Sequence, residues 1–198
     1  RGLLPELGKI LNRPTAIVTM DDLRPLVDEQ VGPDGFPIIR ADLRREYLEE
    51  AVARHQHLRS VVGVGGGQAL DTAKYIAWRL NIPFFQVPTA LSVNAAWGHR
   101  SAVRIDGVVQ YVGWAKPEAI FVDFDIVRAA PPLLNWSGAA DVLCYHTALW
   151  DWRFAQDSGN VEKRWPFDPD LAEKSRAAMR RIVDNVDAIH HVTDDGIR

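Results

Sequence analysis

Three consecutive glycines constrain the fold of this chain more than any other feature of its sequence. Residues 60–64 (Ser-Val-Val-Gly-Val) are an apolar, β-branched run that is typical of a buried strand. The run continues directly into residues 65–67, which are all glycine, and apolar residues from Ala69 to Ala77 then recur at helical spacing. A strand that enters a helix through a glycine turn predicts an α/β unit, because backbone without side chains can turn sharply.

Such a turn can also admit a ligand. At the carboxyl end of a parallel strand, a phosphate can approach the amide groups at the N-terminus of the following helix. The usual dinucleotide-binding spacing G-x-G-x-x-G is absent in both registers, because Gln68 and Leu70 stand where the third glycine would be. From the glycines alone, a tight turn without a ligand therefore remains an alternative.

The flanking sequence alternates strand and helix patterns. β-branched or aromatic runs at 15–19, 38–39, 84–87 and 119–122 predict further strands. An amphipathic helix is predicted after Asp42, which we interpret as its N-cap. Asp106-Gly107, between two β-rich runs, predicts a β-hairpin over 102–112. We therefore expect residues 1–130 to form an α/β domain with a Rossmann-like parallel sheet.

The composition becomes helical after Pro131-Pro132. Helices are predicted over about 138–156 and 168–190, the second with Asp168 as N-cap and Pro169 at its first position. We therefore place a domain boundary near residue 130 and expect 131–198 to begin an all-helical C-terminal domain. Residues 193–198 resemble the start of a helix that does not follow, so we expect this domain to be truncated. A frayed natural terminus is the alternative.

Composition and charge narrow the classes of partner. The chain has 23 Lys+Arg against 26 Asp+Glu, a net charge of -3, and no block of basic residues, which disfavours nucleic acid and anionic membranes. No apolar run approaches the roughly 18 residues that a membrane span needs. The single cysteine, Cys144, excludes an internal disulfide, so a reducing, cytoplasmic location is expected. A small-molecule partner fits these properties best.

Four segments together resemble a known superfamily. They are residues 65–74 (GGGQALDTAK), 87–92 (VPTALS), 117–123 (PEAIFVD) and 137–141 (SGAAD). In order and spacing they resemble the iron-containing alcohol dehydrogenase, glycerol dehydrogenase and dehydroquinate synthase superfamily, and residues 130–132 and 148–155 are most similar to its glycerol-1-phosphate dehydrogenase branch. The resemblance implies a metal-dependent, NAD(P)-linked oxidoreductase that interconverts a small polyol or glycerol phosphate and its ketone.

The resemblance also implies which residues bind the cofactor, NAD or NADP. In similar enzymes a GGGxxxD turn holds the pyrophosphate and a Pro-Thr-x-x-Ser segment contacts the nicotinamide half. The matching positions are Gly65, Gly66, Gly67, Asp71, Thr89 and Ser92. Asp21 stands where such enzymes place an acid against the adenine ribose, which favours NAD. The alternatives are an ordinary Ser/Thr-containing loop, a helix N-cap pair at Asp21 and Asp22, and a solvated charge at Lys74.

The metal implied by the resemblance is a divalent ion, Zn²⁺ or Fe²⁺. Asp141 matches the family's first ligand, and the other ligands are two histidines on later helices; a first-turn helix acid is the alternative for Asp141. His146 would lie about 140° around a straight helix from Asp141 and so could not join it on one ion. We interpret His190 and His191 as capping charges. The metal site is therefore expected to be incomplete in this chain.

Asn94 stands where many relatives have an aspartate, two residues after the serine. A role that needs a carboxylate is not supported there, but an amide can still hydrogen-bond a hydroxyl. We therefore expect Asn94 and Asp141 to be the catalytic residues. Arg100 could bind a substrate phosphate bidentately, and a surface arginine is the alternative. The tryptophans at 136, 150 and 152 are interpreted as packing residues.

Two other functions remain open. A sugar-phosphate cyclase of the dehydroquinate synthase type would have a glutamate at the metal position and a lysine three residues later, whereas this chain has Asp141 and Cys144. A non-catalytic nucleotide-binding fragment is the other, because a cleft that lacks the expected further helices has one wall. Exposed apolar helix faces would also favour self-association into a homo-oligomer.

Overall fold

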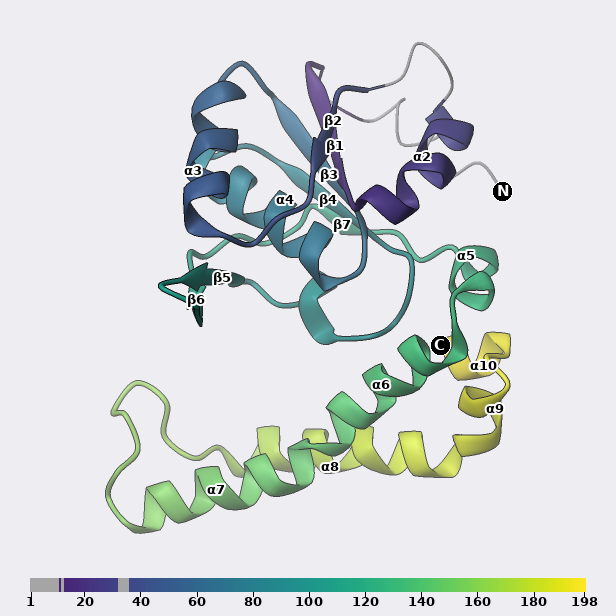
Figure 1. The fold of residues 1–198 in the computed structure, drawn as a ribbon. Coiled ribbons are helices and arrows are strands. Elements are labelled where there is room, and N and C mark those ends of the chain that lie inside the picture. Colours follow the sequence, from purple (N-terminus) through teal and green to yellow (C-terminus); the bar gives the residue numbers. More distant parts are fainter. Residues whose placement is uncertain (1–10, 12, 32–35) are drawn as a thin grey trace.

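The computed structural model of the chain describes residues 11, 13–31 and 36–198, so the first ten residues of the expected 1–130 domain lie outside it. Among the described residues, five parallel strands form one sheet in the order β2-β1-β3-β4-β7 (Figure 1). The strands are β1 (Thr15–Thr19), β2 (Ile38–Arg40), β3 (Ser60–Gly65), β4 (Phe84–Pro88) and β7 (Ala119–Ile120). The predicted α/β class with a Rossmann-like sheet is confirmed.

Helices cover both faces of the sheet. Helices α3 (Arg45–Arg54) and α4 (Gly67–Leu80) lie on one face, and α2 (Arg24–Val31) lies on the other (Figure 1). In β1, Ala16 and Val18 pack in the cluster under α3 and α4, whereas Ile17 packs with Val27 of α2. Successive side chains of a strand point to opposite faces, so a sheet buried on both faces requires continuous apolar runs.

A β-hairpin lies beside the main sheet, as predicted. It consists of β5 (Ser101–Ile105) and β6 (Val108–Val112) and contacts α3 and α4 through β5 (Figure 1). Asp106 and Gly107 in its turn have positive φ angles of 50° and 77°, which is the requirement of a type I′ turn. Two short 3-10 helices, η1 (Asp21–Leu23) and η2 (Asn94–Ala96), follow β1 and β4.

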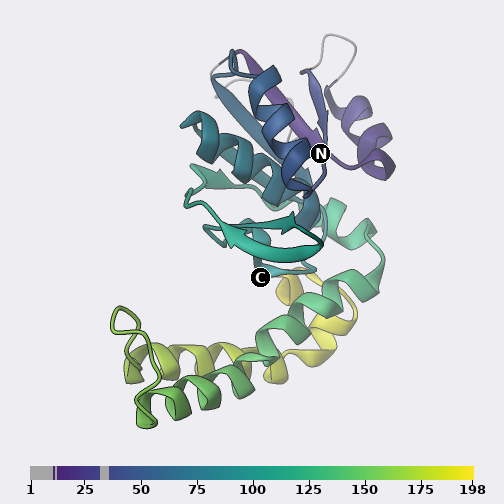
Figure 2. The same cartoon turned by 60° about the vertical axis from the view of Figure 1, so that its left-hand side comes forward.

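The described chain after β7 is helical. Its helices are α5 (Phe124–Ala129), α6 (Pro132–Leu143), α7 (Tyr145–Asp157), α8 (Pro169–Asp184), α9 (Val186–His190) and α10 (Asp194–Ile197). Figure 2 shows α6 and α7 extending away from the sheet with α8 alongside them, and α10 returns to contact α5. In the described part of the chain, no helix has the length and apolar character needed to cross a membrane. The division into domains at residue 130 stays a prediction.

The predicted caps were partly right. Asp168 caps α8, since its side chain accepts hydrogen bonds from the amides of residues 170 and 171. Asp42 does not cap α3, because Arg44 holds the N-cap position. The Oγ1 of Thr72 accepts from the backbone amide of Asp42 and donates to its carbonyl, which fixes this segment against α4. Helix α3 therefore begins at Arg45, and the Asp42 carboxylate pairs with Arg44 instead.

The predicted helix boundaries were wrong in the second half. The helix expected over 138–156 begins at Pro132 and is interrupted at Cys144. The helix expected over 168–190 is interrupted at Asn185, whose side chain donates to the carbonyl of Arg181 at 2.8 Å. The predicted helix start within 193–198 is confirmed, because Thr193 caps α10.

Gly63, in β3, lets α4 pack closely on the sheet. A Cβ at this position would lie 3.0 Å from Ala73 Cβ and from Gln86 Oε1, and 3.2 Å from Leu70 Cα. We expect Gly63→Ala to lower the free energy of unfolding, measured in urea, by about 1–3 kcal/mol, because the backbone must shift to accept the methyl group. Gly98→Ala is the control, since its nearest atom would lie at 3.6 Å. Equal losses in both variants would contradict this account.

Candidate functional site

The strand order of the sheet reverses at β1. Strand β2 pairs with one edge of β1, whereas β3 pairs with the other edge. In open parallel sheets, such a reversal leaves a crevice at the carboxyl ends of the strands. Here the crevice is a cavity of about 540 Å³, termed the carboxyl-edge cavity, between the ends of β1, β3 and β4 and helices α5 and α6. Its lining includes Met20, Asp22, Gly66, Thr89, Ser92, Ile126 and Leu134.

The glycine turn forms part of this cavity. Gly65 has a φ of 147°, and a Cβ there would lie 2.9 Å from Ala69 Cβ, so the position requires glycine. Gly66 has an ordinary φ of -81°, and its added Cβ would approach nothing nearer than Met20 Cε at 3.9 Å. Among the described residues, the space beside Gly66 is therefore open. The first amides of α4 have no acceptor within the helix, so this space adjoins donors suited to an anion.

A second cavity, of about 590 Å³, lies between α4, the segment 93–102 and α6. We term it the loop cavity. Its lining includes Gly67, Gln68, Asp71, Asn94, His99, Arg100 and Asp141. The predicted catalytic residues Asn94 and Asp141 thus share one cavity, while the predicted cofactor residues Thr89 and Ser92 line the other. The neighbouring glycines 66 and 67 border one cavity each, so the two cavities meet at the glycine turn.

A buried ion pair holds the segment 94–102 to α4. Lys74 is 1% exposed, and its Nζ donates to Asp71 Oδ1 at 2.8 Å. The same ammonium donates to the carbonyl oxygens of Ala95 at 2.8 Å and Arg100 at 3.1 Å. The second carboxylate oxygen of Asp71 accepts from the amide of Ala102 at 3.1 Å. Lys74 is therefore not a solvated charge, because burial and three acceptors account for all its donors.

The buried pair has an electrostatic cost. Desolvation raises the pKa of the Asp71 carboxyl above its usual value, and the nearby Lys74 charge opposes this rise without cancelling it. Replacing both members of a buried ion pair destabilises a protein less than removing one member, because the remaining charge is then buried without a partner. Because Asp71 is engaged by Lys74 and Ala102, a role for it in binding pyrophosphate stays a prediction.

We expect Lys74→Met to lower the free energy of unfolding by about 3–5 kcal/mol near neutral pH, because it leaves a carboxylate buried without a counterion. The loss should shrink as the pH falls through the raised pKa of Asp71, since the protonated acid carries no charge. The double variant Asp71→Asn, Lys74→Met removes both charges and should recover most of the stability. Urea denaturation at several pH values measures all three proteins. A double variant less stable than Lys74→Met would contradict this expectation.

Polar contacts hold α6 against the segment that follows β4. The buried side chain of Asn135 accepts from the amide of Leu91 at 2.8 Å, and its own amide donates to a carbonyl of α5 at 2.9 Å. The hydroxyl of Ser137, which donates to the carbonyl of Leu134 in its own helix at 2.7 Å, also lies 3.2 Å from the carbonyl of Ser92. Gly138 permits the close approach, because an added Cβ would lie 1.7 Å from the Leu91 oxygen. These contacts position Asp141, which lies on the same helix.

We expect Gly138→Ala to push α6 away from Leu91, since the methyl group and the carbonyl cannot occupy the same space. The Leu91 amide would then lose its bond to Asn135, and its hydrogen exchange, followed by NMR, should accelerate. Gly98→Ala serves as the control, because its φ is not positive and the added atom would lie no nearer than 3.6 Å to another residue. Unchanged exchange at Leu91 in Gly138→Ala would show that this contact does not hold the helix.

The two acids after β1 have different surroundings. Asp22 lines the carboxyl-edge cavity. Asp21, whose side chain is 74% exposed, pairs with Arg40 Nε at 3.0 Å. Both residues lie within η1, and Met20 occupies its N-cap position, so the alternative of an N-cap pair is wrong. A ribose contact by Asp21 stays a prediction, and Asp22 is a second candidate that sequence reasoning missed.

The described residues do not complete a metal site. Within 11, 13–31 and 36–198, no three His, Cys, Asp or Glu side chains lie close enough together to hold an ion. Asp141 lines the loop cavity, whereas His146 of α7 lines a different one. The His190 ring stacks on Trp136 with 5.0 Å between centroids. A role for Asp141 as a metal ligand thus stays a prediction, and these residues contain no group of three ligands that includes it.

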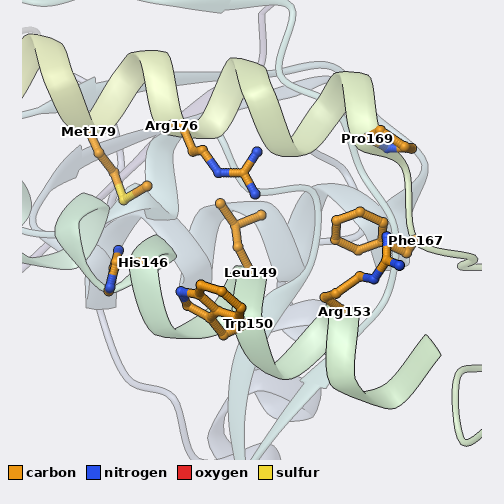
Figure 3. A pocket seen from close by; sticks show the side chains of 8 residues that line it. All are labelled: His146, Leu149, Trp150, Arg153, Phe167, Pro169, Arg176 and Met179. Atoms are coloured by element: carbon orange, nitrogen blue, oxygen red, sulfur yellow. The ribbon is translucent and has the colours of Figure 1, made fainter. Parts of the chain in front are cut away.

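A third cavity, of about 500 Å³, lies between α7 and α8 (Figure 3). Both of its arginines pair with acids, Arg153 with Asp157 and Arg176 with Glu173, which Arg180 shares. Trp150 is 68% exposed here, so its interpretation as a packing residue was wrong. The predicted site residues line the other two cavities or lie outside all three, and none lines this one. The third cavity therefore carries none of the expected chemistry.

Sequence reasoning also missed Asn135 as the residue that joins α6 to the segment after β4. A signal was present, because asparagine is unfavourable inside a helix and its side chain tends to bond backbone groups. His99 was noted only as a neighbour of Arg100. Its ring packs against Trp114 with 5.0 Å between centroids, so it forms part of the wall of the loop cavity.

Comparisons with known proteins support one family. The family model described as iron-containing alcohol dehydrogenase matches residues 19–131. The chain is 34% identical over 159 residues to a glycerol-1-phosphate dehydrogenase (NAD(P)+) of Halobacterium salinarum, a match that covers 79% of this chain and 44% of that protein. It is 36% identical over 96 residues to that of Methanothrix thermoacetophila, covering 48% of this chain and 27% of that protein.

Solved structures share the fold. Glycerol dehydrogenase from Schizosaccharomyces pombe superposes with a TM-score of 0.68 at 22% identity, over 88% of this chain and 47% of that one. A probable glycerol dehydrogenase from Sinorhizobium meliloti 1021 superposes with a TM-score of 0.76 at 21% identity, over 96% of this chain and 55% of that one. This chain thus spans less than half the length of the two curated relatives named above.

Proposed function

Because this chain belongs to the iron-containing alcohol dehydrogenase family, we propose that it binds a nicotinamide dinucleotide at the carboxyl edge of its sheet and supplies one wall of a polyol dehydrogenase site. The observation that carries this proposal is the open space beside Gly66, where an added Cβ meets nothing nearer than 3.9 Å. That space lies at the N-terminus of a 14-residue helix and at the strand-order reversal, which is where dinucleotides bind in such sheets.

The carboxyl-edge cavity and the glycine turn accommodate the parts of the cofactor. In our proposal the pyrophosphate lies at residues 65–67, where the first amides of α4 can donate to it. Thr89 and Ser92 contact the nicotinamide half, and the adenosine half lies in the apolar part of the carboxyl-edge cavity. An acid after β1, Asp22 or Asp21, would accept hydrogen bonds from the ribose hydroxyls and repel a 2′-phosphate, which favours NAD over NADP.

The substrate would lie in the loop cavity. A bound nicotinamide supplies or accepts a hydride at its ring. Asn94 can bind a substrate hydroxyl or carbonyl through its amide, but it is not a base, because an amide does not titrate near neutral pH. Asp141 offers a carboxylate in the same cavity. A divalent metal is proposed from the family, and the described residues supply only Asp141 toward it.

The proposed reaction class is the interconversion of a small polyol or glycerol phosphate and its ketone. Similarity to glycerol-1-phosphate dehydrogenases over 79% of this chain supports it. The loop cavity next to the glycine turn supports it as well, since Gln68, Asn94 and Asp141 on its wall offer hydrogen-bond donors and acceptors to hydroxyl groups. A cytoplasmic location is part of the same proposal.

We expect Gly66→Ala to weaken NADH binding at least tenfold, because the methyl group would occupy the space proposed for the pyrophosphate. The free energy of unfolding should change by no more than about 1 kcal/mol, since the backbone angles at residue 66 suit alanine and only a helix N-cap is altered. NADH fluorescence titration measures the affinity. Lys174→Ala, at an exposed position of α8 that lines neither cavity, should bind as the wild type does.

Two results would contradict the proposal. The first is the absence of NADH binding by the wild-type chain. The second is a Gly66→Ala variant that binds NADH with unchanged affinity.

A further inference from the structure

We propose that Arg100, with His99 beside it, forms an anion-binding subsite in the loop cavity that takes the phosphate of a phosphorylated substrate. The inference rests on the proposed function for the reaction that this cavity serves. It goes beyond that function because it selects a phosphate monoester over a free polyol.

Hydrogen bonds to buried groups fix the backbone at Arg100. Its carbonyl oxygen accepts from the buried ammonium of Lys74 at 3.1 Å, and Ser101, the next residue, is 2% exposed. The carbonyl of His99 accepts from the amide of Ala115 at 2.9 Å. The main chain is thus held at residues 99 and 100, while the Arg100 side chain is exposed and lines the cavity. A cation is therefore presented from a rigid support.

The charge of Arg100 is available to a ligand. In the part of the chain that the structure describes, no carboxylate lies within 4.0 Å of its guanidinium. Two acids line the same cavity: Lys74 neutralises the charge of Asp71, and Asp141 is a further carboxylate elsewhere on the wall. The arginines of the cavity between α7 and α8 differ, because each lies within 4.0 Å of an acid: Arg153 pairs with Asp157, and Arg176 pairs with Glu173, which Arg180 shares. Of the arginines that line these two cavities, Arg100 is therefore the one without an acid partner among the described residues.

The geometry of the ligand follows from the lining. A guanidinium can bind two phosphate oxygens through parallel N–H donors, and the ring of His99 can add a further donor. Asn94 and Asp141 lie elsewhere on the wall of the same cavity. A short molecule with a phosphate at one end and a hydroxyl or carbonyl at the other, such as a triose phosphate or glycerol phosphate, could engage both groups at once.

The test compares two matched variants of the full chain. Arg100→Gln removes the charge from the cavity. Arg104→Gln makes the same change four residues further along, at an exposed position in β5 that does not line the loop cavity. Calorimetric titrations measure the affinity of each protein for glycerol 1-phosphate, glycerol, inorganic phosphate and NADH.

We expect the wild type to bind glycerol 1-phosphate at least tenfold more tightly than glycerol, and to bind inorganic phosphate measurably. Arg100→Gln should lose at least tenfold in affinity for glycerol 1-phosphate, whereas Arg104→Gln should stay within twofold of the wild type. Arg100→Lys should fall between them, since lysine keeps the charge but not the bidentate geometry.

Three results would overturn the subsite. These are wild-type binding of glycerol 1-phosphate no tighter than that of glycerol, equal effects of the two glutamine variants, and an equal loss of NADH affinity in Arg100→Gln, which would assign Arg100 to a cofactor phosphate. The NADH titration of the wild type tests the proposed function separately. If NADH fails to bind while glycerol 1-phosphate binds through Arg100, the subsite stands and the cofactor proposal fails.

Discussion

A single buried ammonium group joins the parts of this molecule that carry its candidate chemistry. Lys74 Nζ bonds the Asp71 carboxylate and the carbonyls at both ends of the segment from Ala95 to Arg100. Because α4 begins at the glycine turn, the same helix positions the candidate phosphate site at its N-terminus and the loop cavity along its side. An unpaired charge in this interior would cost several kcal/mol, so the helix and the loop are coupled.

The position of Asp141 in the site depends on a close approach between two backbone segments. Helix α6 approaches the segment after β4 so closely that only glycine fits at position 138, and Asn135 bonds across the gap. Asp141 reaches the loop cavity through this contact, although it lies far from Asn94 in sequence. The site is thus assembled from the carboxyl edge of the sheet and from one helix outside it.

Much of the fold could be predicted from the sequence, because its patterns are local. The β-branched runs marked strands β1, β3 and β4, and Asp106-Gly107 marked the hairpin turn. The interruptions at Cys144 and Asn185 could not be predicted from the apolar pattern, since it continues through both and neither residue is proline or glycine. The burial of the Asp71–Lys74 pair could not be predicted either. Helical spacing shows that the two residues are neighbours, but it does not show that the segment with Ala95 and Arg100 covers them.

The site residues could be identified in part. The glycine turn and the segment with Thr89 and Ser92 have sequence motifs, and the structure places Gly66, Thr89 and Ser92 around one cavity. Asp22 and Asn135 have no such motif, because their roles depend on which way a side chain points after a short 3-10 helix and on how α6 docks. Partner ligands for Asp141 are absent from the described residues.

The most direct test of the central claim is a titration of the ¹⁵N-labelled chain with NADH, followed by amide chemical shifts. We expect the largest and saturable changes at Gly66, Gly67, Thr89 and Ser92, with smaller changes along the loop cavity. Changes confined to the cavity between α7 and α8, or no saturable change at the glycine turn, would contradict the assignment of a dinucleotide to the carboxyl edge of the sheet.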